Sequence, residues 1–345
     1  MGISELYGKT ARINQIDKAI YESEKEIENG AEAVDAKIVF EELEGKMSNW
    51  DKNIYELLNK QIKIEDLLYL SSGDDSDTFL CNEQYIVKVP KRDDVRDTQK
   101  REFELYNFLE TCGLSYQTPG VVYQGDQFNI MTYISGEHIS YEQYHKLSEK
   151  EKDALAYDEA IFLKELHSIE LDYSYGLFSE AYENKRDRFL EDKELLISIL
   201  KKEKLLTTEI LEHIELIYSK IFSNTVLFEY TPCLVHNDFS AGNMIFRNNR
   251  LFGVIDFGDY AVSDPDNDFL CLLDSSTDDF GKDFGRRVLK YYQHKNPQLP
   301  ERKAEINDAY WAIEQIIYGY KREDKKMLVK GVTELLKIRA DEFLF

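Results

Sequence analysis

The sequence lacks a long apolar run, a cysteine motif and an excess of positive charge. No segment approaches the run of about 18 apolar residues that a membrane helix needs, and the start MGISELYGKT has no signal-peptide core. The four cysteines, Cys81, Cys112, Cys233 and Cys271, are scattered without metal-ligand spacing, which predicts a cytoplasmic protein with reduced, partly buried thiols. The net charge of −23 argues against nucleic acid or an anionic membrane as partner. It suits a cationic ligand, although acidity alone often serves only solubility.

The chain of 345 residues with 43% hydrophobic content is long enough for two lobes behind a polar extension. Residues 1–46 are charged and show helical character from Ala36 onward, so we expect one or two exposed helices without a core. This extension weakly resembles the C-terminal ends of small bacterial antitoxins, which would make it a toxin-binding module. Met47 is an alternative start that leaves 299 residues (345 − 46), so a read-through from an upstream gene stays open as well.

The stretch Cys233–Phe269 organises the rest of the chain. Two short apolar runs, Met244–Phe246 and Leu251–Ile255, flank the polar residues 247–250, a pattern typical of a β-hairpin. His236 and its polar neighbours precede the first run, and an Asp-Phe-Gly triplet follows the second. The hairpin therefore brings the two polar segments to the same end.

Three side chains at that end have the types that phosphoryl transfer needs. Asp238 can orient a hydroxyl group, and Asn243 and Asp256 can hold magnesium. His-x-Asp alone is uninformative, and Asp-Phe-Gly alone is often only a turn. The ordered set, His-x-Asp-x-x-x-x-Asn followed by strand, turn, strand and Asp-Phe-Gly, favours a kinase over a polar loop beside an ordinary hairpin.

The residues before this stretch supply parts of a nucleotide site. Strands at Leu67–Leu70 and Thr78–Cys81 flank a loop that carries Ser72 and Ser76, and such a loop can cover a triphosphate with N–H and hydroxyl groups. It contains a single glycine, so an ordinary hairpin is the alternative.

A lysine on a strand precedes a glutamate on a helix. Lys88 lies among apolar residues of Tyr85–Val89, where a lysine is costly unless it forms an ion pair. Glu102 falls at the start of the expected helix Asp97–Cys112. Joined to the later motif, the two residues predict the ion pair that positions nucleotide phosphates in kinases; in isolation each would be a surface charge.

Two more strands, Val121–Gln124 and Phe128–Tyr133, end at Ser135-Gly136, where we expect a hinge between lobes. Met131 precedes this hinge and would line the base pocket. Beyond it the chain is helical, with a capping box at Ser148-x-x-Glu151. His167 is interpreted as a packing or capping residue. Further helices are expected at 180–225, with a break near 205–208, and at 301–345, where the aromatic stripe with Tyr310 and Trp311 is more often core than ligand platform.

An aspartate run follows the hairpin. Residues 251–281 contain eight aspartates and no lysine or arginine, and the run begins at the functional end of the hairpin. Carboxylates at this density repel one another without a counter-charge, so they indicate a polycationic substrate. A solvated acidic face is the alternative. Asp268 has a structural alternative of its own: it would cap the helix Phe269–Leu273 or brace the loop that carries Asp238.

The segments HNDFSAGN, VIDFGD and DPDNDF resemble the aminoglycoside phosphotransferases, and among them the 2″-O-phosphotransferase branch, over residues from about Asp51 to near the C-terminus. The resemblance implies an α+β, bilobal, protein-kinase-like fold. Its N-lobe (47–134) would be mainly antiparallel sheet with one helix, and its C-lobe (135–345) mainly helical. It also implies residue roles. Asp238 would be catalytic, Asn243 and Asp256 would bind Mg²⁺, Lys88 would contact the phosphates with Glu102 fixing it, and the Ile134 region would bind the base.

The resemblance places substrate contacts on Asp259, Asp274 and Asp278 and, in the C-terminal helix, on Asp308 and Trp311. The sequence also departs from the family pattern. Asn243 stands where close relatives often carry histidine, several family glutamates appear here as the shorter aspartate, and Thr277 stands where another acid is expected. These departures leave the particular antibiotics open.

We therefore predict a monomeric antibiotic-resistance enzyme that transfers the γ-phosphate of ATP or GTP to an aminoglycoside hydroxyl, expected to be the 2″-hydroxyl. A protein kinase is the nearest alternative, but the chain has no long activation loop and no Ala-Pro-Glu after Asp-Phe-Gly. A kinase for choline, another amino-sugar or a macrolide also stays open.

Overall fold

The computed structural model describes residues 52–72, 75–174, 176–274 and 279–339. The polar extension and Asp278 lie outside the described residues. The chain divides into two compact units: the first runs to Asn107 and includes Pro119–Ile134, and the second comprises Phe108–Thr118 and the chain from Ser135 onward. Residues 108–118, which the sequence prediction counted with the N-lobe, thus belong to the second unit.

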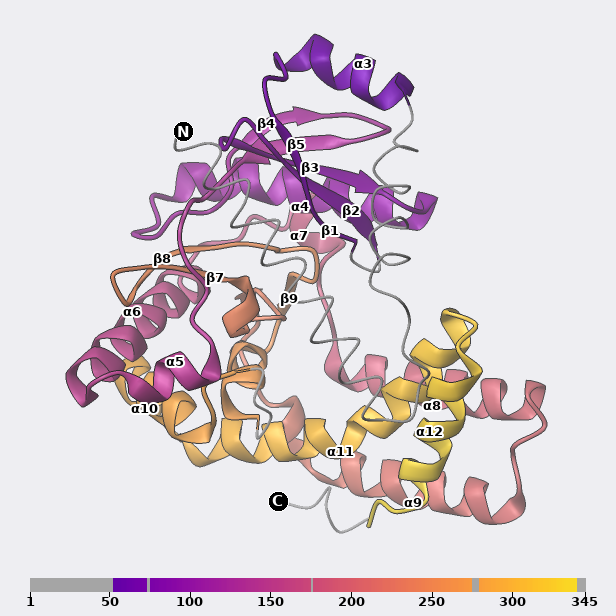
Figure 1. Ribbon diagram of the computed structural model, residues 1–345. Helices are drawn as coiled ribbons and strands as arrows, with labels where there is room; N and C mark the ends of the chain where they lie inside the picture. Colours follow the sequence, from indigo (N-terminus) through magenta and orange to yellow (C-terminus); the bar gives the residue numbers. More distant parts are fainter. Residues whose placement is uncertain (1–51, 73–74, 175, 275–278, 340–345) are drawn as a thin grey trace. The chain divides into compact units, whose positions relative to one another are not determined.

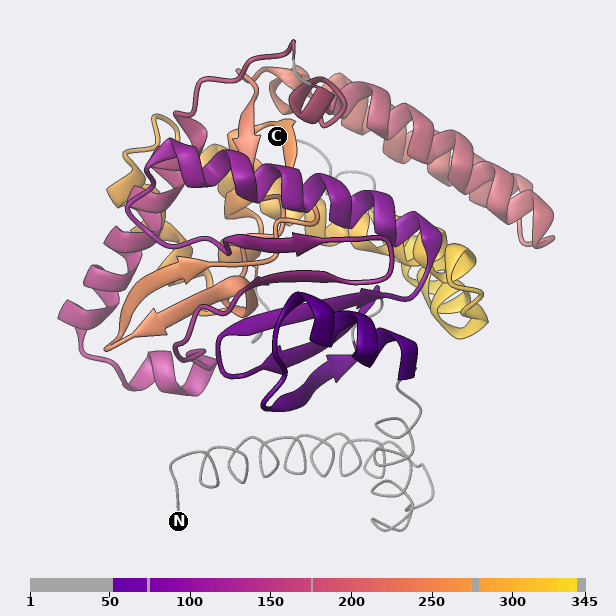
Figure 2. The same cartoon turned by 90° about the horizontal axis from the view of Figure 1, so that it is seen from above.

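The first unit is built on an antiparallel sheet whose strands follow the order β1-β2-β3-β5-β4. The strands are β1 (Leu67–Ser72), β2 (Ser76–Cys81), β3 (Tyr85–Pro90), β4 (Val121–Gln124) and β5 (Asn129–Thr132). Two helices, α3 (Lys52–Gln61) and α4 (Asp93–Cys112), lie on opposite sides of this sheet (Figures 1 and 2). Because α4 begins at Asp93 rather than Asp97, Glu102 lies well inside the helix and not at its start.

Strand β3 shows how the sheet separates core from site. Successive side chains of a strand point to opposite faces, so Val87 and Lys88 diverge. Val87 is fully buried in a cluster with Leu58 of α3, Phe79 and Ile130. Lys88 therefore faces the side of the sheet that α4 covers, where a carboxylate can reach it.

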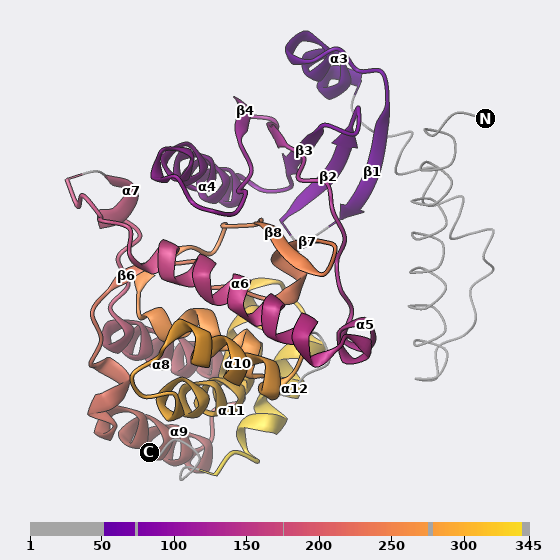
Figure 3. The same cartoon turned by 90° about the vertical axis from the view of Figure 1, so that its left-hand side faces the viewer.

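The second unit is mainly helical. Its helices are α5 (Tyr141–Lys146), α6 (Glu149–His167), α7 (Gly176–Ser179), α8 (Lys185–Lys202), α9 (Thr208–Ser223), α10 (Lys282–Tyr292), α11 (Gln298–Lys321) and α12 (Lys325–Leu335). The predicted capping box is present, because Ser148 and Glu151 exchange their side-chain and backbone hydrogen bonds at the start of α6. The break between α8 and α9 also falls where the sequence predicted it. Helices α6 and α10 lie side by side (Figure 3).

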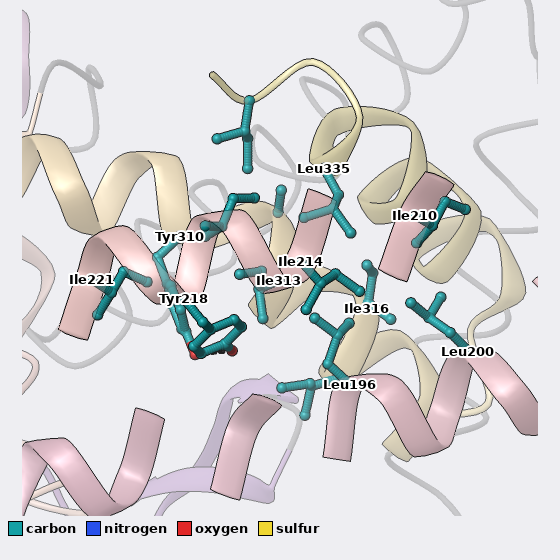
Figure 4. Packing of buried hydrophobic residues seen from close by; sticks show 14 of the residues in the cluster. Leu196, Leu200, Ile210, Ile214, Tyr218, Ile221, Tyr310, Ile313, Ile316 and Leu335 are labelled. Atoms are coloured by element: carbon teal, nitrogen blue, oxygen red, sulfur yellow. Dashed lines mark hydrogen bonds between the residues drawn. The ribbon is translucent and has the colours of Figure 1, made fainter. Parts of the chain in front are cut away.

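Helices α8, α9, α11 and α12 share one hydrophobic core (Figure 4). The predicted aromatic stripe of α11 contributes to it through Tyr310, which is 4% exposed and whose hydroxyl lies 2.8 Å from that of Tyr218. Trp311 is different: it is 45% exposed. The core prediction is therefore right for Tyr310 and wrong for Trp311, because adjacent helix positions face different directions.

The predicted hairpin is present as β7 (Met244–Arg247) and β8 (Arg250–Val254), paired antiparallel. Its turn residues Asn248 and Asn249 both have positive φ, 52° and 58°, as a two-residue hairpin turn with matching twist requires. A second pair, β6 (Cys233–Val235) and β9 (Ala261–Ser263), flanks the hairpin in sequence.

All four cysteines are free thiols, as their scattered spacing predicted. Among the described residues, none of the helices combines the length and apolar character that crossing a membrane would require.

Candidate active site

The loop between β6 and β7 joins Asp238 to Asn243. The amide nitrogen of Asn243 donates to the Asp238 carboxylate over 2.8 Å and to the Asp238 carbonyl over 2.9 Å. A short 3₁₀ turn, Ala241–Asn243, closes the loop. Because the NH₂ group of Asn243 is directed at Asp238, its amide oxygen is the atom left to face a cation.

Asp256 follows β8 and joins this group. The backbone N–H of Ile255 donates to the Asn243 carbonyl over 2.9 Å, which fixes the start of the Asp-Phe-Gly turn beside Asn243. Asp256 is exposed and has a φ of 64°, a left-handed conformation that aspartate tolerates better than most residues.

Burial is the main cause of a raised pKa at Asp238, and the nearby charges of Asp256 and Asp268 add to that rise. His236 and Asn243 act in the opposite direction and stabilise the ionised form. The predicted convergence of Asp238, Asn243 and Asp256 at one end of the hairpin is therefore present. Their chemical roles stay predictions.

Asp268 braces the loop that carries Asp238. It is fully buried, and its two oxygens accept the backbone N–H groups of His236 over 2.9 Å and Asn237 over 2.6 Å. Residue 237 has a φ of 68°, so this anchor holds a left-handed backbone. His167 bonds Asp268 over 3.0 Å and the Tyr292 hydroxyl over 2.9 Å, which confirms its packing role.

Of the two structural alternatives for Asp268, bracing is therefore right and helix capping is wrong. Asp268 lies inside the 3₁₀ helix Pro265–Phe269, and the N-cap of that helix is Asp264.

Much of the aspartate run does not face a substrate, which corrects the expectation from the sequence. Asp264 and Asp266 are 1% and 3% exposed. Lys303 contacts both carboxylates at 2.6 Å, and Lys185 contacts Asp264 at 2.7 Å. His294 lies 2.9 Å from Asp266. The counter-charges missing from the local sequence arrive from helices α8 and α11 and from the segment that follows α10.

Asp279 has a structural place too. It is 5% exposed and accepts the Ala241 N–H over 2.5 Å, so it steadies the same loop as Asp268.

A cavity of about 400 Å³ opens beside Asp238 within the second unit. Of the predicted substrate residues, Asp259 and Trp311 line it. Asp274 and Asp308 do not line the cavity, but the two carboxylates lie close enough to each other to interact electrostatically. Burial, followed by the charge of Asp274, raises the pKa of Asp308 to about 6, and Lys282 opposes this. The fifth predicted substrate residue, Asp278, lies outside the described residues.

The cavity wall contains residues that the sequence analysis missed. They come from segments far apart in the chain and comprise Glu183, Lys185, Arg188, Phe189, Leu227, Asn237, Asn267, Leu270, Cys271, Lys303, Ile306, Asn307, Tyr310, Glu314 and Tyr318. One signal was available, because Trp311, Glu314 and Tyr318 recur at the three- and four-residue spacing of one helix face. Nothing local in the sequence marks Glu183 or the cations of α8 as cavity residues.

The first unit contains the predicted ion pair. Lys88 Nζ lies 3.1 and 3.3 Å from the two oxygens of Glu102, and the side chains are 17% and 2% exposed. The Tyr106 hydroxyl donates to Glu102 Oε1 over 2.7 Å and helps to fix the carboxylate. A buried glutamate held this way sets the direction of the lysine.

The other predicted nucleotide residues are also in the first unit. Ser76 accepts a hydrogen bond from the Gln99 side chain over 2.5 Å, and Gln99 in turn accepts one from Asn129 over 2.7 Å. Met131 and Ile134 are buried, at 4% and 5% exposure, and Ile134 ends the unit. The side chain of Ser72 lies outside what the structure describes.

The donor set suits magnesium. Among the described residues, His, Cys, Asp and Glu side chains do not gather in threes around a metal-sized site. Magnesium in phosphotransfer sites needs fewer protein ligands, because phosphate oxygens and waters complete its shell. One carboxylate, Asp256, and one amide oxygen, Asn243, match that requirement.

Residues 66–306 match the family described as the phosphotransferase enzyme family. The chain belongs to this phosphotransferase family. Among solved structures, it is 76% identical to APH(2″)-IIa in a gentamicin complex, with a TM-score of 0.84, over 86% of this chain and 99% of the other. ADP-bound aminoglycoside phosphotransferase APH(2″)-Ib is also 76% identical, with a TM-score of 0.83, over 86% of this chain and 100% of the other.

These relatives confirm the resemblance to the aminoglycoside phosphotransferases and the mixed α+β, kinase-like fold, and they overrule the protein-kinase alternative. The macrolide 2′-phosphotransferase MphH from Brachybacterium faecium has a TM-score of 0.63 at 12% identity, over 84% of this chain and 99% of the other. That likeness concerns the fold alone. The reaction class of this phosphotransferase, transfer of a phosphate group to an aminoglycoside, therefore follows from its relatives.

Proposed function

We propose that this phosphotransferase transfers the γ-phosphate of a nucleoside triphosphate to the 2″-hydroxyl of an aminoglycoside and thereby confers antibiotic resistance. The observation that carries this proposal is the position of Asp238. It lies in the wall of a cavity that also exposes Asp259, Glu183 and Glu314, so an acceptor with several ammonium groups can bind beside it. The gentamicin complex of APH(2″)-IIa supports the choice of acceptor.

Asp238 would act by positioning the acceptor hydroxyl. Its carboxylate is held by Asn243 and by the loop that Asp268 anchors, so it can accept a hydrogen bond from the hydroxyl in a fixed direction. Transition states of phosphoryl transfer are loose, and in-line alignment then matters more than proton removal. The raised pKa of Asp238, caused mainly by burial, makes it a better acceptor for the proton as the reaction proceeds.

Asn243 and Asp256 would hold Mg²⁺, which when bound neutralises charge on the transferring phosphate. Lys88 would contact the nucleotide phosphates from the first unit. Its ammonium group is directed by the buried Glu102, so the charge is already oriented before the nucleotide binds. Ser72 and Ser76 would contact the phosphates, and Met131 and Ile134 would contact the base.

The acidic wall of the cavity would bind the ammonium groups of the antibiotic. A single exposed ion pair contributes about 1 kcal/mol or less, but several pairs in one cavity give both affinity and orientation. Asp274, Asp278 and Asp308 would make further acidic contacts with the antibiotic. Adding a phosphate there places negative charge beside the cationic groups through which the antibiotic binds ribosomal RNA.

ATP is the nucleotide best supported by relatives. APH(2″)-IIa, whose structure with streptomycin and ATP has been solved, is 75% identical in sequence over 86% of this chain. GTP stays within the proposal, since the flexible side chain of Met131 can adapt to either purine. We further propose that the enzyme acts in the cytoplasm as a monomer, without nucleic acid or membrane partners.

The test is a phosphorylation assay of the full-length chain with Mg²⁺ and either ATP or GTP. Kanamycin-, gentamicin- and neomycin-type antibiotics are compared with choline, a simple amino-sugar and a macrolide, and NMR locates the phosphate on any product. The proposal expects aminoglycoside products that carry phosphate at the 2″ position. Phosphate at another hydroxyl would overturn the regiochemistry, and turnover only of choline or a macrolide would overturn the substrate class.

A further inference from the structure

An arginine lies in the wall of the cavity that we propose binds the ammonium groups of the acceptor. Arg188, in the first turns of α8, lines the cavity together with Glu183 and Glu314. A guanidinium group at this place would repel an ammonium group at short range. The proposed function does not by itself explain why it is there.

Arg188 is surrounded by three carboxylates. Its Nη1 lies 3.3 and 3.4 Å from the two oxygens of Glu183, its Nη2 lies 3.4 Å from Glu314, and its Nε lies 3.9 Å from Asp192. The five N–H groups of a guanidinium form a planar fork that can serve several acceptors at once. One positive charge thus joins three negative charges from α8, from α11 and from the segment before α8.

The three carboxylates have different surroundings. Glu183 and Glu314 line the cavity, with side chains 22% and 18% exposed. Asp192 does not line it and accepts a hydrogen bond from the Tyr310 hydroxyl over 3.1 Å. Two of the three partners of Arg188 therefore remain in reach of a ligand while they hold the arginine.

Arg188 differs in this from the two lysines in the same wall. Lys185 and Lys303 are paired with the buried Asp264 and Asp266, which do not line the cavity. The positive charges of the two lysines are thus neutralised by aspartates that do not line the cavity. The positive charge of Arg188 is neutralised largely by Glu183 and Glu314, which do line it.

We propose that Arg188 is a positioning residue that orients the carboxylates of Glu183 and Glu314 toward the ammonium groups of the acceptor. The proposal rests on the function proposed above. The fork keeps the two carboxylates apart at fixed positions, and together with Asp192 it leaves the cluster with a net charge of about −2 at neutral pH. A cationic acceptor then meets ionised, preoriented acids rather than mobile ones.

The electrostatics of Glu314 agree with this role. Burial raises the pKa of Glu314, Arg188 is the group that lowers it, and Asp192 raises it further. The other titratable and charged groups that act in this cluster are Glu183, Asp259, Tyr218, Tyr310, Tyr318, Lys321 and Arg322. Without Arg188, Glu314 would lose the group that lowers its pKa, while the charge of Asp192 would still raise that pKa.

The experiment compares Arg188→Gln with the wild type in the full-length chain over a series of pH values, because loss of the arginine removes the group that lowers the pKa of Glu314. Arg186→Gln is the matched control, because Arg186 lies on the same helix turn but stacks 5.4 and 5.3 Å from the Phe222 and Phe228 ring centres. Both KM values and kcat are measured, and thermal melting verifies folding.

We expect the antibiotic KM of Arg188→Gln, divided by that of the wild type, to exceed one and to increase as the pH falls. Titration of one carboxylate changes this ratio by up to about tenfold per pH unit. The nucleotide KM and kcat should stay unchanged. Arg188→Lys should remove the pH trend but restore only part of the affinity, because a lysine supplies the charge without the fork. Arg186→Gln should match the wild type throughout.

A second comparison tests whether Arg188 acts through Glu314. We expect Glu314→Gln to weaken antibiotic binding and the double variant Arg188→Gln/Glu314→Gln to show a weaker pH trend than Arg188→Gln alone. A fall in KM on removing Arg188 would overturn the inference and make the arginine a competitor of the substrate. A rise in KM that is equal at every pH, with a lowered melting temperature, would reduce its role to structure. Failure of the wild type to phosphorylate any aminoglycoside would instead overturn the proposed function.

Discussion

Two groups of carboxylates near the catalytic loop look alike in sequence and have opposite environments. Asp264, Asp266 and Asp268 are buried and hold lysines, histidines or backbone N–H groups. Asp238 and Asp259 line a cavity of about 400 Å³ in the same unit. The first group fixes the frame of the site, and the second lines its cavity.

This contrast teaches that local charge density does not assign function. The aspartate run contains no lysine or arginine between residues 251 and 281, so a cationic substrate looked like its natural counter-charge. Lys303, from a helix far along the chain, supplies that charge to two of the aspartates at 2.6 Å. Burial without such a partner would cost several kcal/mol per ion, so the buried members had to be paired internally.

The largest effect is expected for Asp238→Asn. The amide cannot accept the hydroxyl proton and would disturb the bond from Asn243, so kcat should fall by about 10²- to 10⁴-fold. The melting temperature and the dissociation constant of the nucleotide should change little, because Asp238 belongs to the cavity group. Near-normal kcat would contradict the role given to this residue. Steady-state kinetics and nucleotide titration measure the two quantities.

A different loss is expected for Lys303→Met, which removes the shared cation of Asp264 and Asp266. Asp264 keeps Lys185 and Asp266 keeps His294, but the loss of the buried cation that both carboxylates share still costs about 3 kcal/mol of unfolding free energy. Lys330→Met, at an exposed position of α12, is the control and should stay within about 0.5 kcal/mol of the wild type. Denaturant unfolding measures both. Equal stability of the two variants would contradict the claim that the buried aspartates depend on an internal cation for the stability of the fold.

A moderate and selective effect is expected for Asp259→Asn. The loss of one ion pair in a partly open cavity is worth about 1 kcal/mol, which corresponds to a roughly fivefold higher KM for the antibiotic. Stability and the nucleotide KM should not change. Asp283→Asn on α10, an exposed aspartate outside the cavity wall, serves as the matched control. An unchanged antibiotic KM in Asp259→Asn would remove this residue from the substrate site.

The smallest effect concerns Asp308, whose pKa is raised from 3.8 to about 6, mainly by burial of its carboxylate. The folded state holds this proton more tightly than the unfolded chain, so ionisation destabilises the fold as the pH rises through about 6. Asp308→Asn should therefore melt at a higher temperature than the wild type at pH 7 and at the same temperature near pH 4, measured by thermal unfolding. Because this burial is only partial and solvent screens the charge of the carboxylate, the difference will be small. A lower melting temperature at pH 7 would contradict the raised pKa.

Local patterns predicted well where one segment carries the whole signal. The hairpin at 244–254, the capping box at Ser148 and the break between α8 and α9 follow from residue types a few positions apart. Lys88 and Glu102 were paired correctly because a lysine among apolar strand residues needs a partner. The start of α4 and the exposure of Trp311 were misplaced, since helix ends and helix facing depend on what packs against them.

Sequence alone determined the order of the catalytic motif, because a hairpin must bring the residues before and after it to the same end. It determined the family as well, because HNDFSAGN, VIDFGD and DPDNDF are contiguous. Only the tertiary structure decided which aspartates hold lysines and which face the cavity, and only it brought Arg188 between Glu183 and Glu314. The physical reason is that ion pairing and burial join residues distant in the chain, and no local spacing records those contacts.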